Sequence, residues 1–498
     1  MIEMGAIPEE GNLFFKEVPE SLEDITEQWC ELALRRGDVI GSNTTVSNVE
    51  LSRLVNEETG ALDGGGMTSS QMVRIKLTYN GNDDGYDPPS AIIAKHLNTG
   101  KNLYSGTFCF RLMVATFVGR NAEERTWRTD IKFQREALPV IADVYSHPKV
   151  YYSGIIDGGN RSFFNEVIRP APHKIRSITL MQDMQGWKSQ TAGVDRVNYN
   201  QASAILQNVA ILHGKFWGDK HEKMKQSFIN ASCEREARGC AHSKFALKKR
   251  NKFLSNSNSV QKSLKKMLKD WTESKWFSVS GVAAVPDWMI TQHGASEKDQ
   301  CIFVLKDPSV KEMLEVYCDR FPKFSNEVSK SYLEMPNQTL LHGDFHNGNH
   351  MYLEEADKVK VVAFDFQMVG QGVAASDIVK FFNVGKSHYS FQEDMDLIRK
   401  YHESLVASGV ENYEYEDLKK HFVLGCLEYL TKIMMDMTRS NPEKMTKMCK
   451  SMFGEEKFKD FMKIVESGVI CNVFLFVTSL YLRNKLAFLK GEKFLDEI

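Results

Sequence analysis

The pattern of apolar residues changes near Gly186, and this change restricts the fold more than any other feature of the sequence. Before it, the segments TTVSNVELSRLV, SSQMVRIKLTY and SAIIAKHL are rich in β-branched residues and are separated by turn-forming runs. After it, apolar residues recur at helical spacing, as in NQASAILQNVAILHGKFWGD. The sequence therefore predicts an antiparallel sheet followed by a large helical part.

The length of the chain also favours two parts. At 498 residues it exceeds the size at which one hydrophobic core usually stops growing. We expect a helical extension over residues 1–40, a β-rich part over 41–184 and a helical part over 185–498. Within the extension, PESLEDITEQWCELALRRG has the pattern of one amphipathic helix that Ser21 caps, with Asp24 three residues on. Between Lys244 and Lys275 the chain has 10 Lys or Arg and 2 acids. We interpret the region near 230–300 as a solvated insertion, with an anionic partner for the basic stretch as the alternative.

Composition narrows the class of protein. The chain is 42% apolar and 26% charged, and its net charge of -2 favours neither a nucleic acid nor a membrane surface as a partner. Its nine cysteines are scattered without a CxxC pair, which is typical of reduced thiols in the cytoplasm. The most apolar stretch, Gly468 to Leu482, has 15 residues, whereas a membrane span needs about 20. We expect a cytoplasmic protein without a membrane span.

The segment LLHGDFHNGNHMYLEEADKVKVVAFDFQ concentrates polar side chains in a short loop and then has the pattern of a hairpin. A strand near His350 is followed by a charged turn and a second strand that ends at Phe364. Such a hairpin returns Asp365 to the loop that carries Asp344 and Asn349. Two carboxylates and a carboxamide are therefore expected to converge.

This set of side chains suits phosphoryl transfer, which depends mostly on positioning and charge neutralisation. Asp344 can accept the proton of an attacking hydroxyl, while Asn349 and Asp365 offer the hard oxygen ligands that Mg²⁺ prefers. The Asp-x4-Asn spacing is that of the kinase catalytic loop. Upstream, Lys95 in AIIAKHL matches a strand lysine that holds phosphates of ATP. It follows the glycine run of DGGGMTSS, whose backbone amides can approach phosphates: Gly64, Gly65 and Gly66.

A zinc site is the alternative interpretation of the loop. His342, His346 and His350 recur at intervals of four, which on a helix would form one metal-binding face. Gly343, Gly348 and the hairpin pattern disfavour a helix there. We therefore expect His342 to brace the loop and His346 to lie near phosphate or substrate.

Six pieces of sequence together resemble a known family: HGDFHNGN, FDFQMVGQG, SDIVKFF, ILHGKFW, LMQDM and DIKFQREALP. They are similar to the aminoglycoside phosphotransferase and choline kinase-like family, including its ecdysteroid kinase-like branch. The resemblance implies an α+β, bilobal, protein kinase-like fold with an antiparallel N-lobe sheet and a mainly helical C-lobe. It also implies an ATP- and Mg²⁺-dependent kinase that phosphorylates a hydroxyl group of a small molecule.

The resemblance assigns roles to individual residues. It implies that Asp377 helps to hold the catalytic loop. Kinases pair the strand lysine with a glutamate, but the matching position here is Asp130, one methylene shorter. We favour Asp130 as the partner, with Glu136 or Glu124 as alternatives. The implied site comprises Asp344 as base, Asn349 and Asp365 on Mg²⁺, Lys95 on phosphate, and Gln182, Asp183 and Met184 around adenine.

Other functions remain open at this point. A nucleotide-binding pseudokinase or scaffold is the main alternative, although the full set of site residues disfavours it. A protein kinase is disfavoured because no APE segment follows DFQ, and Ser376 comes only 11 residues after Asp365. Aminoglycosides, choline-like amines, sterols and sugars all remain candidate substrates, and the oligomeric state is open. We expect His213 to pack in the helical core. For Trp217, Trp271, Trp276 and Trp288 we expect core or surface packing, with an aromatic cage for a quaternary ammonium as the alternative.

Overall fold

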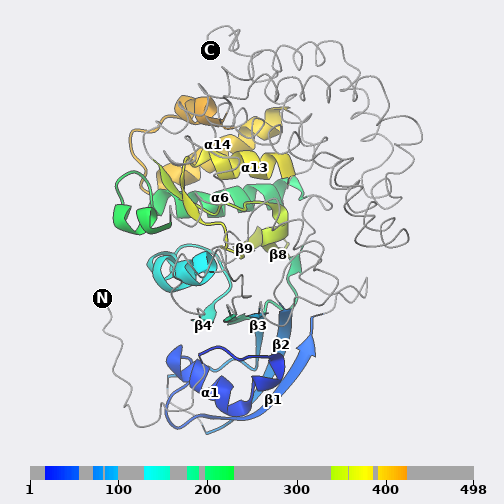
Figure 1. The fold of residues 1–498 in the computed structure, drawn as a ribbon. Coiled ribbons are helices and arrows are strands. Elements are labelled where there is room, and N and C mark those ends of the chain that lie inside the picture. The colour runs from blue at the N-terminus through cyan, green and yellow to red at the C-terminus, as the bar shows by residue number, and fades with distance from the viewer. Residues whose placement is uncertain are drawn as a thin grey trace, which may run out of the picture. The chain divides into compact units, whose positions relative to one another are not determined.

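The structure is a computed structural model, and its elements are shown in Figure 1. It describes residues 17–54, 71–81, 85–98, 128–156, 176–189, 197–228, 338–356, 358–384, 391–422 and 425. The basic stretch 244–275 and the apolar stretch 468–482 lie outside these residues. The chain divides into two compact units, Met1–Ala142 with His147–Gly186, and Asp143–Ser146 with Trp187–Ile498. The division at residues 40 and 184 stays a prediction.

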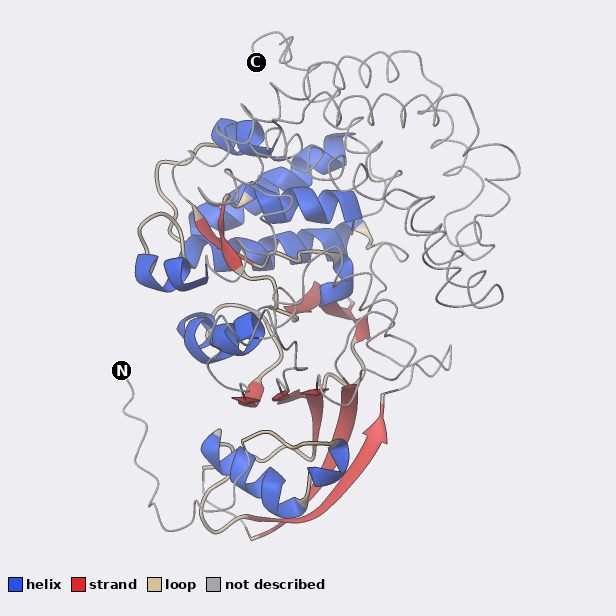
Figure 2. Cartoon of the chain, in the orientation of Figure 1, coloured by secondary structure: helices blue, strands red, loops and turns tan. Residues whose placement is uncertain are grey.

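The first unit contains a five-stranded antiparallel sheet (Figure 2). Its strand order is β1-β2-β3-β5-β4. The strands span Thr45–Arg53 (β1), Gln71–Asn80 (β2), Ala91–Asn98 (β3), Val150–Ile156 (β4) and Arg176–Gln182 (β5). The three strands expected from β-branched runs are confirmed as β1 to β3, while the sequence analysis missed β4.

Helix α1 (Glu27–Arg36) packs against one face of this sheet. Trp29 and Cys30 are buried there with the inward residues of the strands, such as Ile75 and Ala94. Because side chains alternate along a strand, Lys95 points to the opposite face. The Lys95 side chain therefore lies on the face of the sheet opposite to α1.

The start of α1 differs from the expected one. A single helix capped by Ser21 was predicted, but Ser21 and Asp24 close a separate 3-10 turn, η2 (Leu22–Asp24). The Asp24 carboxylate accepts from both Ser21 N and Ser21 Oγ, and the chain leaves helical geometry at Ile25. The α-helix then begins after a second N-cap, Thr26, whose side chain accepts from the Trp29 amide.

The helical pattern around DIKFQREALPVI forms a helix with a wide turn in its middle. Residues 128–132 are α-helical, followed by the π-helical turn η4 (Phe133–Ala137) and by α4 (Leu138–Ile141). The Leu138 amide donates to the Phe133 carbonyl, five residues earlier. Pro139 lacks an amide proton and cannot donate to the Arg135 carbonyl four residues earlier, so the α-helical hydrogen-bond pattern is interrupted next to this turn.

The second unit is mainly helical. Its helices α6 (Tyr199–Lys215) and α14 (Phe391–Ala407) pack together, and α13 (Ala375–Val384) lies in the same unit. Two small antiparallel sheets accompany them. One pairs β7 (Thr339–Leu341) with β10 (Gly370–Gly372), and the other has the order β6 (Lys188–Ser189), β8 (His350–Glu355), β9 (Lys358–Ala363). The predicted α+β class, with an antiparallel sheet and a mainly helical second part, is confirmed.

Within the described residues, none of the helices combines the length and the apolar character that crossing a bilayer requires.

Candidate active site

The strand lysine of the first unit contacts an aspartate. Lys95 Nζ lies 3.1 Å from Asp130 Oδ2, and the two side chains are 17% and 6% exposed. Glu136 instead lies 3.9 Å from Lys132 Nζ on the surface, and Glu124 is outside the described residues. Among the described acidic residues that were expected as partners of Lys95, Asp130 is therefore the one that contacts it.

Two neutral side chains hold Asp130 in place, and neither was identified from the sequence. Gln134 Nε2 donates to Asp130 Oδ1 at 3.2 Å, and Thr179 Oγ1 donates to Gln134 Oε1 at 2.9 Å. Thr179 is also the β5 residue opposite Lys95 in the strand register. The signal available in the sequence was the four-residue spacing of Asp130 and Gln134, which places them on one helix face.

The segment expected to line adenine follows β5. Gln182 ends that strand, and its amide donates to the Lys149 carbonyl at 2.8 Å. The Asp183 carboxylate is bound by Arg74 Nε at 2.7 Å and by Arg74 Nη2 at 3.3 Å. The Asp183 side chain is therefore already paired, which leaves its backbone groups for a base. Gly64, Gly65 and Gly66 lie outside the described residues.

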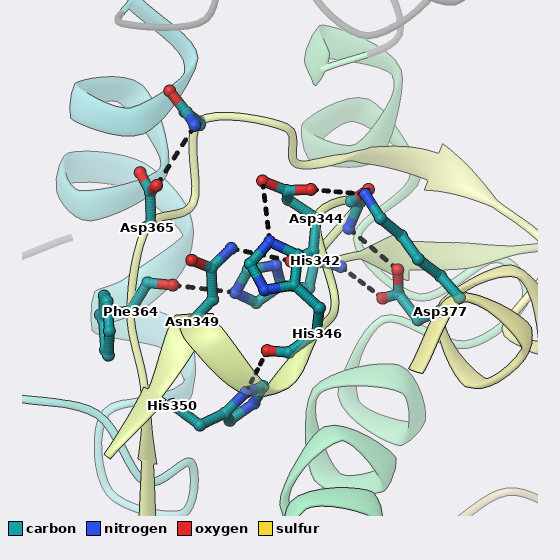
Figure 3. A network of polar contacts seen from close by, with 11 residues as sticks. His342, Asp344, His346, Asn349, His350, Phe364, Asp365 and Asp377 are labelled. Atoms are coloured by element: carbon teal, nitrogen blue, oxygen red, sulfur yellow. Dashed lines mark hydrogen bonds and ion pairs between the residues drawn. The ribbon is translucent and has the colours of Figure 1, made fainter. Parts of the chain in front are cut away.

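In the second unit, the loop from His342 to Asn349 connects β7 to the β8–β9 hairpin (Figure 3). We call it the 342–349 loop. Gly343 has a φ of 78°, and a Cβ added there would lie 2.0 Å from the Met368 carbonyl oxygen. Only glycine fits this position without displacing the backbone. The loop ends in the 3-10 turn η5 (Asn347–Asn349).

The hairpin brings the three expected polar residues to one place. Asn349 Nδ2 donates to the Asp344 carbonyl at 2.8 Å, and the Phe364 amide donates to the Asn349 carbonyl at 3.1 Å. Asp365 follows directly, with a φ of 65° that is uncommon for a residue other than glycine. Its Oδ2 accepts from Gln367 Nε2 at 3.2 Å. Figure 3 shows Asp344, Asn349 and Asp365 around the loop.

A buried aspartate fixes the start of the loop. Asp377 on α13 accepts from the His342 amide at 2.7 Å and from the Gly343 amide at 3.0 Å. His213 Nε2 lies 3.2 Å from Asp377 Oδ2, and His213 Nδ1 lies 2.7 Å from the Tyr401 hydroxyl. His213 is buried, as expected for a core residue, but it also contacts the side chain that holds the loop backbone.

The Asp344 carboxylate lies between two basic side chains. Lys380 Nζ is 2.5 Å from Asp344 Oδ1, and His346 Nε2 is 3.6 Å from Asp344 Oδ2. Burial raises the pKa of Asp344, but Lys380 and His346 outweigh this and hold it well below its usual range. The sequence analysis missed Lys380, whose spacing of three from Asp377 on a helix was the available signal.

His342 in the loop and His350 at the start of β8 act as neutral braces. His342 Nε2 lies 3.1 Å from the Phe364 carbonyl oxygen, and His350 Nδ1 lies 2.8 Å from that of His346. Burial lowers the pKa of His342, and burial with nearby His342 lowers that of His350 to about 3. In the part of the chain that the structure describes, no three His, Cys, Asp or Glu side chains are grouped as metal ligands. Because His342 and His350 each direct one ring nitrogen to a backbone carbonyl, the described geometry favours a bracing role for these two side chains.

The donor set fits a hard divalent cation. Because the Asn349 side chain donates its NH₂ to the Asp344 carbonyl, its Oδ1 is left as an uncharged oxygen ligand. Asp365 adds a carboxylate, directly after Phe364, whose amide donates to the Asn349 carbonyl. Carboxylate and amide oxygens, completed by water, are the ligands that Mg²⁺ prefers.

The structure describes one of the four tryptophans considered for an aromatic cage. Trp217 is 7% exposed and packs against Tyr413, with ring centroids 4.8 Å apart. Trp271, Trp276 and Trp288 lie outside the described residues.

Comparison with solved structures gives matches of low identity. A microcompartment-associated aminopropanol kinase is 9% identical, with 92% of this chain and 97% of that chain covered and a TM-score of 0.39. An ethanolamine kinase of Plasmodium vivax is 11% identical, with 92% and 91% covered and a TM-score of 0.33. A choline kinase from Streptococcus pneumoniae is 9% identical, with 86% and 93% covered and a TM-score of 0.29. No curated protein sequence matches the chain.

Comparison with protein families gives a match over more than half of the chain. The model of the ecdysteroid kinase-like family matches residues 65–415. The matched range includes every residue described above from Lys95 to Asp377. On this match, the chain belongs to the ecdysteroid kinase-like family.

Proposed function

We propose that the protein is an ATP- and Mg²⁺-dependent phosphotransferase that phosphorylates a hydroxyl group of a small molecule. The observation that carries this proposal is the convergence of Asp344, Asn349 and Asp365 through the 342–349 loop and the β8–β9 hairpin. Membership of the ecdysteroid kinase-like family supports the same activity.

Asn349 and Asp365 are the residues that would hold Mg²⁺, which neutralises phosphate charge when bound. The left-handed backbone at Asp365 supports a functional role, because such a conformation costs about 1–2 kcal/mol in a residue other than glycine. Asp377 keeps the loop amides in place, so the polar groups are set before any ligand arrives.

Asp344 would receive the proton of the acceptor hydroxyl. Its Oδ1 is occupied by Lys380, which leaves Oδ2 to accept a hydrogen bond from that hydroxyl. With its pKa well below the usual range, the Asp344 carboxylate is a weak base. Its main contribution is therefore to orient the hydroxyl, with proton transfer late in the reaction, as a loose phosphoryl-transfer transition state permits.

Lys95 would bind phosphate oxygens from the first unit. A lysine is a compact point charge on a flexible stem, so its position depends on its partner. Asp130, itself held by Gln134 and Thr179, restricts where the Lys95 ammonium can lie. ATP is the nucleotide we propose.

An acceptor screen tests the proposal. Purified protein with ATP and Mg²⁺ is incubated with hydroxylated aminoglycosides, amino alcohols, sterols and sugars, and ADP and product masses are measured. We expect ADP release with at least one acceptor, together with a product heavier by one phosphoryl group. ATP binding without transfer to any acceptor would favour the alternative, a pseudokinase or scaffold, which the presence of Lys95, Asp344, Asn349 and Asp365 argues against.

A further inference from the structure

One turn of helix α13 holds the 342–349 loop through two charged side chains. Asp377 accepts from the His342 and Gly343 amides. Lys380, three residues further along the same helix face, donates to the Gly343 carbonyl at 3.1 Å and to Asp344 Oδ1 at 2.5 Å. The amide and the carbonyl of Gly343 are therefore both bound by side chains of α13.

The contact from Lys380 limits the orientation of the Asp344 carboxylate. The backbone of Asp344 is fixed on one side by Gly343 and on the other by the bond from Asn349 Nδ2 to its carbonyl. The remaining freedom lies in the rotation of the side chain. With Oδ1 held by the ammonium, Oδ2 is the oxygen that remains for another partner, 3.6 Å from His346 Nε2.

This pair differs from an ordinary surface ion pair. Exposed pairs contribute little, because two long side chains must be ordered for a weak attraction in water. Lys380 and Asp344 are 22% and 24% exposed, and Lys380 has a second acceptor on the loop backbone. A charge-assisted hydrogen bond with two fixed acceptors defines one geometry for both side chains.

We propose that Lys380 is a positioning residue, which holds Asp344 so that only Oδ2 is presented to the acceptor hydroxyl. The effect on catalysis rests on the proposed function. The positioning of the loop by Lys380, however, can be measured without any turnover. Lys380 acts through Asp344 and not on the nucleotide. Its loss should therefore lower kcat and leave the KM for ATP nearly unchanged.

Three variants test this role. Lys380→Met removes the charge and roughly keeps the volume of the stem, while Lys380→Arg keeps the charge. Lys400→Met is the control for losing a lysine ion pair away from the loop, because Lys400 on α14 pairs with Asp396 at 3.4 Å and donates to the Tyr199 hydroxyl at 3.0 Å. Amide hydrogen exchange is measured in peptides that cover residues 338–350, and kcat and KM are measured with the acceptor found in the screen.

We expect Lys380→Met to speed exchange in the loop and to lower kcat, each by about tenfold or more, with the KM for ATP within about twofold. Lys380→Arg should recover most of both, and Lys400→Met should change neither. In an Asp344→Asn background, Lys380→Met should lower kcat by less than about threefold further, because the two residues act as a unit.

Two outcomes would overturn the inference. Unchanged loop exchange in Lys380→Met would show that the lysine does not position the loop, whatever the activity. Losses of kcat that multiply in the double variant would show that Lys380 acts independently of Asp344. Faster loop exchange in Lys380→Met, with no turnover of any acceptor by the unaltered protein, would support the positioning and refute the proposed function instead.

Discussion

Replacing Asp130 by alanine tests the ion pair between Lys95 and Asp130, on which the proposed phosphate-binding role of Lys95 depends. The change leaves the Lys95 ammonium, whose side chain is 17% exposed, without the carboxylate 3.1 Å away. Removing one partner of a fully buried pair costs about 3–5 kcal/mol, whereas exposed pairs contribute about 0–1 kcal/mol. Because Lys95 retains some contact with water, we expect a cost of about 2–3 kcal/mol, including the lost hydrogen bond from Gln134.

The matched control is Glu136→Ala on the same helix. Glu136 is 52% exposed and lies 3.9 Å from Lys132, so its removal should cost about 0.5 kcal/mol or less. The expected difference of about 2 kcal/mol corresponds to a factor of about 30 in a local opening equilibrium.

Amide hydrogen exchange in β3 (Ala91–Asn98) measures this difference directly. Asp130→Ala should raise exchange there by about 30-fold or more, while Glu136→Ala should stay within about threefold of the unaltered protein. Turnover should fall in the first variant and not in the second. Equal exchange and equal turnover in the two variants would refute the assignment of Asp130 as the partner of Lys95.

Three further predictions concern single positions. Lys95→Met should reduce the rise in melting temperature that ATP with Mg²⁺ produces, because a point charge on the phosphates is lost. An unchanged rise would refute the assignment of Lys95 to the nucleotide site. Gly343→Ala should lower the free energy of unfolding by more than about 2 kcal/mol in urea titrations, because alanine is strained in the left-handed backbone and its Cβ clashes with Met368. Equal stability of the two proteins would contradict the loop geometry. Burial, with a smaller effect of Glu27, raises the pKa of Cys30 to about 12. In mass spectrometry, its thiol should therefore resist alkylation at pH 8 in the folded protein and react after denaturation. Rapid labelling of the folded protein would contradict this.

Features with a local signal could be predicted from the sequence. Strands β1 to β3 follow from β-branched runs between turns, and the β8–β9 hairpin follows from two such runs around a charged turn. Helix α6 follows from the spacing of Ile205, Val209 and Leu212, all buried in the structure. In each of these, the interactions that form the element lie close together along the chain.

Features that depend on packing between distant segments could not be predicted in this way. Lys380 meets Asp344 across 36 residues, because Asp377 docks α13 on the loop. Thr179 meets Gln134 only once β5 lies beside β3. The start of α1 was missed for a different reason. Ser21 and Thr26 are both residue types that cap helices, and the α-helix begins after Thr26 because the chain leaves helical geometry at Ile25.

The roles of the site residues therefore stay predictions that rest on chemistry. Gln182, Asp183 and Met184 illustrate this. The pairing of Asp183 with Arg74 shows that its side chain is not available to a base without breaking two hydrogen bonds. A role for Asp183 at adenine would have to use its backbone groups.

The central claim, that the 342–349 loop performs phosphoryl transfer, is tested most directly by comparing Asp344→Asn with Asp365→Asn. Transfer from ATP to the acceptor is measured in a single turnover, and Mg²⁺-dependent nucleotide binding is measured by calorimetry on the same samples. Asp344→Asn should lower the transfer rate by about 10² to 10⁴ and keep nucleotide binding, because the proton acceptor is lost while the metal ligands remain. Asp365→Asn should weaken both, because a full charge on the metal is lost. Full transfer activity in Asp344→Asn would contradict the account, as would stoichiometric zinc that disappears when His342, His346 and His350 are replaced together.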